Sequence, residues 1–408
     1  MQVSIVEAPL RRVLVGVSGG IAIYKAVEFV RLLSKEGFAP TVIETVAAKR
    51  FVMPLTFAAA ARAAVLDDDT TWQADGGWFE HIEAAREAEV MVVAPATANT
   101  IAKLATGIAD NLLTATYLAF RGPVVVAPTM NWAMYEHEAT RRNLALLAER
   151  GVEVLPASRG DLACGEEGLG RMAEPVVILQ AVKAGFARLA AGPLAGQRVV
   201  VTAGGTREAI DAVRYIGNRS SGKMGRAVAD EAYLRGAVVT LVDTTTGAPD
   251  APYDVVGVES AEQMAAAVDE HVGDADVLVM AAAIADYRPQ TITAGKIDRA
   301  ATPELTLRLV PTVDVLAASA RPGLLRVAFA AEAGPQLDRA RAKKAAKDVD
   351  LLVFNDILAA GIGIGSDENE ITIIGGDDEV HVPRVSKAAC ARAILDSVEA
   401  VLAARDGR

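Results

Sequence analysis

A glycine-rich segment in the second half of the chain comes close to the spacing of a phosphate-binding loop. GNRSSGKMG, residues 217–225, has the Gly-x4-Gly-Lys pattern of a P-loop. Met224, however, stands where a P-loop carries the Ser or Thr hydroxyl that holds Mg²⁺. A P-loop also follows a buried strand, whereas the preceding residues include Asp211 and Arg214. We therefore expect this segment either to serve an anionic ligand by another route or to be a solvated basic loop.

Three chemically reactive side chains lie near apolar runs or in a glycine-rich stretch of the first half. Asn131 directly follows the apolar run at 123–127, and His81 precedes the apolar run at 89–94. Cys164 lies in a polar, Gly-rich stretch rather than in an apolar segment, where a thiol can have a chemical role. A lone histidine is more often structural than catalytic, and a buried cysteine is usually inert. The residue types alone leave both interpretations open.

Each half of the chain opens with an apolar strand, a pair of glycines and an amphipathic helix. Residues 11–37 place Ser18, Gly19 and Gly20 at the start of the expected helix, which favours an anion site. Residues 197–208 repeat the strand and the glycine pair. Such a pair can also be only a tight turn, and the segment lacks the GxGxxG pattern of a dinucleotide site.

Apolar runs alternate with helical stretches in both halves, as is typical of parallel sheets covered on both faces. We therefore predict an α/β protein with two doubly wound three-layer domains, 1–190 and 191–408, divided near residue 190 in a Gly-bearing stretch that contains Pro193. An antiparallel strand pair is expected at 370–374 and 379–382. In doubly wound folds ligands bind beyond the carboxyl ends of the strands, so both sites should lie there.

Composition narrows the class of protein. The formal net charge of −11 over 408 residues disfavours nucleic-acid binding. Cys164 and Cys390 are too few for a disulfide framework or an all-cysteine zinc site. No signal peptide and no run of ~18 apolar residues is evident. We expect a cytoplasmic protein without a membrane partner.

Five motifs in the first half resemble those of the flavin-dependent cysteine decarboxylases. They are SGGIA (18–22), His81-Ile82, PATANT (95–100), PTMNWAMY (128–135) and ACGEEGLGRM (163–172). The similarity continues through the second half, to the family of bifunctional phosphopantothenoylcysteine decarboxylase/phosphopantothenate–cysteine ligases. It implies a flavodoxin-like flavoprotein domain with bound FMN, whose phosphate suits a helix N-terminus. The FMN contacts implied are Ser18, Gly19, Thr45, Pro95, Ala96, Thr97, Ala98 and Thr129.

The resemblance also implies the chemistry of the first half. A cysteine carboxylate does not simply lose CO₂, because the resulting carbanion has no electron sink. Oxidation of the CH₂–SH group to a thioaldehyde by FMN supplies that sink, and the product enethiol is then reduced by the flavin. His81 is the implied base, Asn131 the neutral group that holds the carboxylate, and Cys164, on a mobile flap, the final proton donor. Tyr135 stands where the family often has Trp, which leaves the role of Asn131 intact.

Four motifs of the second half resemble the phosphopantothenate–cysteine ligases and follow in order: residues 201–225, 281–289, 295–299 and 328–332. They imply a Rossmann-like domain that uses CTP and Mg²⁺ to convert 4'-phosphopantothenate into an acyl-cytidylate, from which cysteine displaces CMP. The implied catalytic residues are Lys296, Asn218 and Arg214. The implied nucleotide contacts are Ala281, Ala282, Asp286, Lys296, Val313, Asp314, Val315, Leu316, Phe329, Lys343 and Lys347, and no residue is assigned to the metal.

Some features leave alternatives open. The family often has KIKK where this chain has KIDR, so Asp298 places a negative charge near the triphosphate and makes the choice of CTP over ATP less secure. The resemblance implies decarboxylase halves that assemble as trimers or higher, with sites between subunits, and ligase halves that pair as dimers, and hence a homo-oligomer larger than a trimer. The alternatives are a decarboxylase of peptidyl cysteine and a flavin-binding regulatory protein without activity, which the attached ligase motifs and the retained chemical groups argue against.

Overall fold

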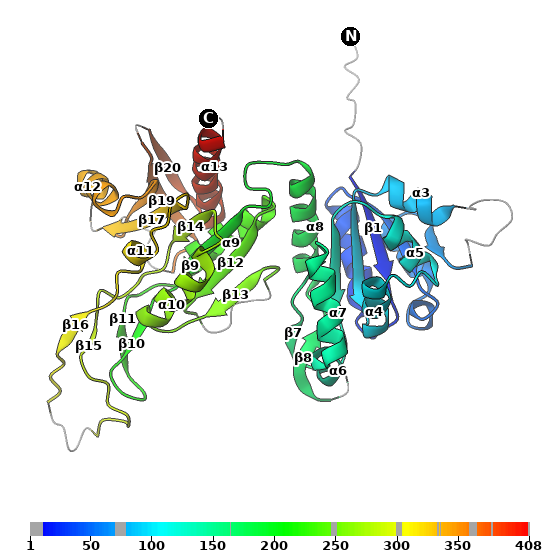
Figure 1. Cartoon of the computed structure of the whole chain (residues 1–408), viewed down its shortest axis with the longest axis horizontal. Coiled ribbons are helices and arrows are strands. Elements are labelled where there is room, and N and C mark those ends of the chain that lie inside the picture. Colours follow the sequence, from blue (N-terminus) through cyan, green and yellow to red (C-terminus); the bar gives the residue numbers. More distant parts are fainter. Residues whose placement is uncertain are drawn as a thin grey trace, which may run out of the picture. The chain divides into compact units, whose positions relative to one another are not determined.

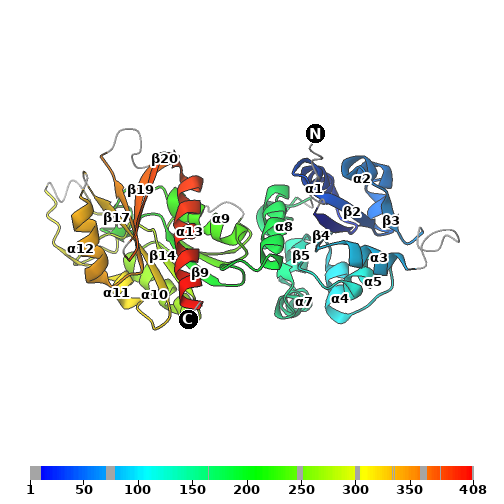
Figure 2. The ribbon, with the colours of Figure 1, turned by 90° about the horizontal axis from the view of Figure 1, so that it is seen from above.

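The computed structural model describes residues 11–69, 79–163, 165–245, 251–298, 304–332, 334, 336–358, 365–376 and 378–406. The chain forms two compact α/β units, one reaching Ala190 and the other beginning at Ala191 (Figure 1). Each unit has its own main sheet, with helices on both faces (Figure 2). The predicted α/β class of two doubly wound three-layer folds is therefore confirmed.

A six-stranded parallel sheet forms the centre of the first unit. Its strands lie in the order β3-β2-β1-β4-β5-β6. The buried residues of β1 and β4 match the apolar runs of the sequence, as expected for strands covered on both faces. Because the strand order reverses between β1 and β4, a topological switch point lies there. The bounds are β1 (Arg12–Val17), β2 (Ala39–Glu44), β3 (Val65–Asp67), β4 (Val90–Ala96), β5 (Val124–Pro128) and β6 (Glu153–Val154).

Helices form two layers on this sheet (Figure 2). One layer contains α1 (Ile23–Lys35), α2 (Pro54–Ala61) and α8 (Pro175–Leu189). The other contains α3 (Glu80–Glu87), α4 (Ala98–Thr106), α5 (Leu112–Ala119) and α7 (Glu138–Glu149). The short η1 (Ala48–Arg50) follows β2, and α6 (Trp132–Glu136) follows β5. Helices α4 and α5 of the second layer bury Ile101, Leu104 and Leu113 against the sheet. This packing holds the first residues of α4 at the carboxyl edge of the sheet.

The Gly-rich stretch expected to be a flap forms an antiparallel hairpin. Its strands are β7 (Ser158–Asp161) and β8 (Glu167–Arg171). Cys164, which lies between these strands in the sequence, is outside the described residues. The hairpin backbone is therefore more regular than its glycine content suggested.

The second unit is built on an eight-stranded sheet in the order β13-β12-β9-β14-β17-β18-β19-β20. Its six parallel strands take the order 3-2-1-4-5-6 of a Rossmann fold. The antiparallel pair predicted near the end of the chain is confirmed as β19 and β20. The bounds are β9 (Arg198–Ala203), β12 (Val238–Asp243), β13 (Asp254–Gly257), β14 (Val277–Met280), β17 (Leu325–Glu332), β18 (Leu351–Asp356), β19 (Glu368–Ile374) and β20 (Glu379–Ser386).

Among the residues that the structure describes, five helices and two small hairpins complete the second unit. Helices α9 (Lys223–Leu234) and α13 (Lys387–Asp406) pack together on one face of the sheet. Helices α10 (Ala261–Val272), α11 (Val315–Ala318) and α12 (Leu337–Lys347) lie on the other. The hairpins pair β10 (Arg207–Ala209) with β11 (Tyr215–Gly217) and β15 (Tyr287–Pro289) with β16 (Leu309–Pro311).

Candidate active sites

A cavity of about 580 Å³ lies at the carboxyl edge of the first sheet. Three strand-to-helix junctions meet it: β1 to α1, β4 to α4, and β5 to α6. The first two junctions flank the switch point between β1 and β4, where a ligand is expected. Most of the lining is apolar, and its polar and charged side chains include Thr97, Thr129, Asn131, Lys25, Arg171 and Asp161.

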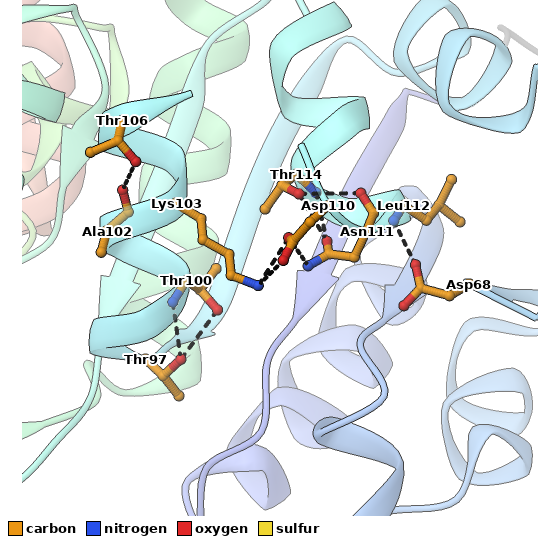
Figure 3. A network of polar contacts seen from close by, with 10 residues as sticks. All are labelled: Asp68, Thr97, Thr100, Ala102, Lys103, Thr106, Asp110, Asn111, Leu112 and Thr114. Atoms are coloured by element: carbon orange, nitrogen blue, oxygen red, sulfur yellow. Dashed lines mark hydrogen bonds and ion pairs between the residues drawn. The ribbon is translucent and has the colours of Figure 1, made fainter. Parts of the chain in front are cut away.

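Ser18 ties the first two junctions together. Its hydroxyl donates to the carbonyl oxygen of Pro95 at 2.7 Å and accepts from the backbone N–H of Thr97 at 3.1 Å. Thr97 in turn caps α4 by accepting from the N–H of Thr100 (Figure 3). Because Ser18 is buried and donates its proton within the protein, its main role in this structure is to hold the two loops together.

Four other predicted flavin contacts shape the same edge. Pro95 and Ala96 are buried at the end of β4, so any contact of theirs with a flavin would be made by the main chain. The hydroxyl of Thr45 donates to the carbonyl oxygen of Val17 at 3.2 Å and accepts from the N–H of Ala48 at 3.3 Å. Ala98, the first residue of α4, lines the cavity. These residues position the junctions around the cavity.

Two glycines set the space at the first junction. A Cβ at Gly19 would lie 2.7 Å from the main chain of Ala47, so only glycine allows this close approach. A Cβ at Gly20 would point between Thr97 and Thr129, 3.6 and 3.8 Å from their methyl groups. The open volume beside the first turn of α1 suits a flat apolar ring system that carries an anionic group. The residues present therefore fit a flavin mononucleotide.

The polar residues that follow this junction along the chain serve the helices. Lys103 forms an ion pair with Asp110 at 2.7 Å (Figure 3). Asn111 caps α5 by accepting from the N–H of Thr114 at 3.0 Å. Asp68, next to β3, accepts from the N–H of Leu112 at 2.6 Å. These ion pairs and hydrogen bonds thus stabilise the connection between α4 and α5.

The side chain of Asn131 uses both ends of its amide. Its oxygen accepts from the N–H of Ala133 at 2.9 Å and caps α6. Its Nδ2 donates to Oε2 of Glu166 at 2.8 Å, and the indole N–H of Trp132 donates to the same oxygen at 2.9 Å. A carboxylate from the β7–β8 hairpin therefore already lies against the amide that was predicted to hold a substrate carboxylate.

The hairpin is docked onto the loop after β5. The N–H of Met130 donates to the carbonyl oxygen of Gly170 at 3.0 Å. A Cβ at Gly170 would lie 2.1 Å from the carbonyl oxygen of Met130, and its φ of +147° also favours glycine. Lys25 and Arg171, which line the cavity, were not singled out from the sequence. The sequence feature that could have drawn attention to Lys25 is its positive charge in the first turn of an amphipathic helix.

The structure places His81 in the first turn of α3, half-buried, with the rest of that helix between it and β4. The expectation from the sequence that His81 comes just before a strand is wrong, because a helix separates His81 from β4. Helix α3 packs against α5, and His81 is not among the described residues that line the cavity. Within one chain, His81 is therefore not brought to the cavity that holds Asn131.

In the second unit, the GNRSSGKMG segment does not have the setting of a P-loop. Its first residue, Gly217, ends β11, a short strand that pairs with β10 outside the main sheet, and α9 begins after Gly222, whose φ is +71°. Lys223 forms an ion pair with Asp367 at 2.6 Å. Arg226 donates to Asp243 at 2.7 Å, and the other oxygen of that carboxylate accepts from the N–H and hydroxyl of Thr245. These two cations are paired, and the interpretation as a merely solvated basic loop does not fit them.

Asn218 joins this segment to the loop after β14. Its Nδ2 donates to the carbonyl oxygen of Ile284 at 2.9 Å, and the N–H of Ala282 donates to the hydroxyl of Thr202 at 3.1 Å. Asp286 is exposed at the end of the same loop. The predicted residues Asn218, Ala281, Ala282 and Asp286 thus gather at the carboxyl edge between β9 and β14, the switch point of the second sheet.

Lys296 is exposed on a segment without helix or strand, but its neighbour is firmly held. The N–H of Ile297 donates to the carboxylate of Asp211 at 3.1 Å, and Arg214 donates to the carbonyl oxygen of Ile297 at 3.3 Å. Arg214 and Asp211 also form an ion pair at 2.7 Å. Burial works to raise the pKa of Asp211, but hydrogen bonds from the N–H groups of Val213, Arg214 and Ile297 outweigh it and lower this pKa to about 2.

The remaining predicted nucleotide contacts come from α11, α12 and β17. Lys343 and Lys347 lie four residues apart on α12, and Lys347 forms an ion pair with Asp314, the residue that caps α11. Phe329 is half-buried on β17. Val315 is buried in the core, so its contact with a ligand would come from its main chain. Val313 is exposed, Leu316 is half-buried, and Arg299 lies outside the described residues.

The described part of the chain shows neither a membrane-spanning helix nor a cluster of metal ligands. No helix there is both long and apolar enough to cross a membrane. In the same residues, His, Cys, Asp and Glu side chains form no group of three or more that could hold a metal ion. Cys390 is buried within α13, and this burial raises the pKa of its thiol to about 11, as expected for a structural cysteine.

Comparison with known proteins identifies both units. Residues 4–187 match the Flavoprotein family, and residues 194–402 match the DNA/pantothenate metabolism flavoprotein C-terminal domain. The Coenzyme A biosynthesis bifunctional protein CoaBC of Bacillus subtilis is 42% identical, with 96% of this chain and 97% of the relative covered. The CoaBC protein of Mycobacterium tuberculosis is 43% identical, with the same 96% and 97% covered. A crystal structure of the C-terminal domain of a CoaBC protein is 34% identical, with a TM-score of 0.44, and covers 52% of this chain and 98% of that chain. The chain belongs to the family of coenzyme A biosynthesis bifunctional proteins.

Proposed function

We propose that the protein catalyses two successive steps of coenzyme A biosynthesis. The second unit joins 4'-phosphopantothenate to cysteine with CTP and Mg²⁺, and the first unit decarboxylates the phosphopantothenoylcysteine so formed, with FMN as cofactor. The observation that carries the decarboxylase assignment is that Nδ2 of Asn131 binds a carboxylate, that of Glu166 at 2.8 Å, beside a cavity that fits a flavin. Similarity over nearly the whole chain supports the pairing of the two activities.

The cavity of the first unit supports FMN binding. The first turn of α1 offers N–H groups to the phosphate, and the space beside Gly20, Thr97 and Thr129 accommodates the rings. When bound, FMN supplies a reversible acceptor for the electron pair of the substrate CH₂–SH group. Ser18 and Thr45 hold the loops around the cofactor.

The protein side chains position the substrate and move its protons. Asn131, whose Nδ2 donates to the carboxylate of Glu166 in this structure, would hold the substrate carboxylate through the same atom, and a neutral amide does so without an ion pair that would oppose the departure of CO₂. His81 accepts the proton released from the substrate, and Cys164 returns a proton to the product. Lys25 and Arg171 also lie at the wall of the cavity, together with Asp161, and Lys25 is paired there with Glu174 at 2.7 Å.

A homo-oligomer would complete the first site. His81 does not line the cavity of its own chain, whereas Ile21 and Tyr24, each 61% exposed, and Met134, 50% exposed, lie at it. A second copy that covers these apolar side chains could supply its own His81.

In the second unit, a two-fold contact is supported by exposed apolar side chains on the β10–β11 and β15–β16 hairpins: Tyr215, Tyr287 and Leu309. Three-fold and two-fold contacts together give a closed assembly larger than a trimer.

The second unit is suited to activation of a carboxylate by a nucleotide. Lys296 stabilises the charge that develops when the carboxylate of 4'-phosphopantothenate attacks the α-phosphate of CTP. Asn218 and Arg214 hold the acyl-cytidylate while cysteine displaces CMP. Lys343 and Lys347, one turn apart on α12, offset the charge of the triphosphate together with Mg²⁺.

Incubation of the full chain with 4'-phosphopantothenate, cysteine, CTP and Mg²⁺ tests both activities. We expect CMP, pyrophosphate and CO₂ to form in equal amounts, from a preparation that is yellow with flavin. A parallel reaction with ATP tests the nucleotide preference that Asp298 makes uncertain. CMP without CO₂ would remove the decarboxylase assignment, and a colourless protein that does not bind added FMN would do the same. CO₂ release from supplied phosphopantothenoylcysteine without CMP formation would remove the ligase assignment.

A further inference from the structure

Asp211 has a buried carboxylate whose partners come from two segments far apart in the sequence. Its side chain is fully buried, and it accepts from the N–H groups of Val213 at 2.8 Å and Arg214 at 2.7 Å within its own turn. It also accepts from the N–H of Ile297, 86 positions later. Because Arg214 binds the carbonyl oxygen of the same Ile297, both polar groups of that residue are held by the Asp211–Arg214 pair.

We propose that Asp211 is a positioning residue of the ligase reaction: it fixes the segment that carries Lys296 and the guanidinium of Arg214 in one arrangement. The inference rests on the ligase function proposed above. Asp211 itself is too deeply buried to touch a substrate, so it acts through Lys296 and Arg214. The contact between Arg214 and Ile297 depends on the ion pair that orients the guanidinium.

The Lys296 segment needs such an anchor. Residues 291–296 are exposed and have no helix or strand, so few backbone hydrogen bonds hold them. One further tie, from the N–H of Thr293 to the carbonyl oxygen of Ile210 at 3.1 Å, comes from the residue before Asp211. Both ties therefore lead to the same turn. A lysine side chain is long and flexible, and misplacement by about 1 Å can cost a catalytic group up to about 100-fold in rate.

The test is a double-mutant cycle in the full chain, with Asp211→Asn and Lys296→Gln. Pyrophosphate release is measured without cysteine, which isolates formation of the acyl-cytidylate. We expect Asp211→Asn to lower the maximal rate about 10- to 100-fold while KM for CTP changes little, because an interaction realised in the transition state is lost. When Lys296 is already Gln, we expect Asp211→Asn to add less than about twofold to the loss.

Two controls separate positioning from a loss of folding. Asp276→Asn is a matched variant, because Asp276 also accepts a backbone N–H, from Arg198 at 2.7 Å, but at the amino edge of the sheet; it should keep the wild-type rate. CO₂ release by the first unit of each variant reports whether the chain is intact. Amide hydrogen exchange should show lost protection at Ile297 without a general loss in the second unit.

Three results would overturn the inference. They are a normal pyrophosphate rate in Asp211→Asn, a full multiplicative loss in the double variant, and loss of exchange protection throughout the second unit. Failure of the proposed function looks different, because the wild-type chain would then release no pyrophosphate with either CTP or ATP.

Discussion

At the scale of single residues, the contact between Asn131 and Glu166 determines what a charge at position 131 would do. Asn131→Asp would place two carboxylates within hydrogen-bond distance, since Nδ2 and Oε2 are 2.8 Å apart. The new charge also repels a substrate carboxylate. We expect CO₂ release to fall by about 100-fold or more, while CMP formation by the other unit stays unchanged in the same assay.

A matched control and a second variant sharpen this test. Asn111→Asp changes another asparagine that caps a helix in the same unit, where Asp is an equally good cap, and it should keep normal CO₂ release. The double variant Asn131→Asp with Glu166→Gln removes the repulsion toward the hairpin but not toward the substrate. Recovery of CO₂ release in the double variant would show that Asn131 does not hold the substrate carboxylate.

Glu44, at the end of β2, makes stability depend on pH. Both of its carboxylate oxygens are buried and, among the described residues, have no hydrogen-bond partner. Burial raises the pKa of this carboxyl to about 7, although the charge of Lys49 acts in the opposite direction. Between about pH 4.5 and 7 the folded chain keeps a proton that the unfolded chain releases, so the free energy of unfolding falls as pH rises through this range.

Glu44→Gln should remove that dependence and stabilise the first unit at pH 8 by roughly 1 to 3 kcal/mol relative to wild type. All three tryptophans of the chain precede residue 190, so urea unfolding followed by tryptophan fluorescence reports this unit. Glu36→Gln, which removes an exposed partner of Lys183, is the control and should not change the slope above pH 6. An unchanged pH slope in Glu44→Gln would contradict the prediction.

At the scale of elements, the β7–β8 hairpin acts on the site only while it is docked. Gly170→Ala would force a Cβ against the carbonyl oxygen of Met130 and strain a backbone with φ of +147°. We expect CO₂ release to fall about tenfold or more because the hairpin shifts, with CMP formation unaffected. Gly257→Ala, whose Cβ would meet nothing within 4 Å, should leave both rates normal. Normal CO₂ release in Gly170→Ala would mean that hairpin docking is not needed.

At the scale of the whole molecule, exposed apolar side chains on the small hairpins of the second unit predict an assembly contact. Leu309, 38% exposed on β16, is suited to a test because a charge there would be desolvated in an interface. Leu309→Glu should lower the mass measured by light scattering, and Val238→Glu, at the more exposed Val238 of β12, should not. A wild-type monomer, or an unchanged mass in Leu309→Glu, would contradict the proposed two-fold contact.

The elements of both units were largely predictable from local sequence patterns. The apolar runs at 89–94 and 123–127 are found as β4 and β5, and the glycine pair at 19–20 precedes α1 as expected. Apolar periodicity and turn residues are local signals that do not depend on the rest of the chain. The same signals located the candidate sites at the carboxyl edges of the sheets.

The contacts that organise the sites could not be predicted in this way. Glu166 and Asn131 are 35 positions apart, and Asp211 and Ile297 are 86 apart. Asp211 was read as a charge that argues against a buried strand, yet it is buried because backbone N–H groups satisfy it. His81 was expected beside the first site, and nothing local indicates that its helix packs elsewhere.

The ion pair of Arg226 with Asp243 has a consequence for coenzyme choice. In dehydrogenases built on this strand order, an acidic residue at the end of the second strand receives the ribose hydroxyls of the adenosine. Asp243 stands at the end of β12, the second strand, but both of its oxygens are already engaged by Arg226 and Thr245. The ribose hydroxyls of a pyridine dinucleotide would have to compete with Arg226 and Thr245 for that carboxylate. The second unit thus shares the strand order of these dehydrogenases, but its acidic residue at this position holds an arginine and a threonine of its own chain.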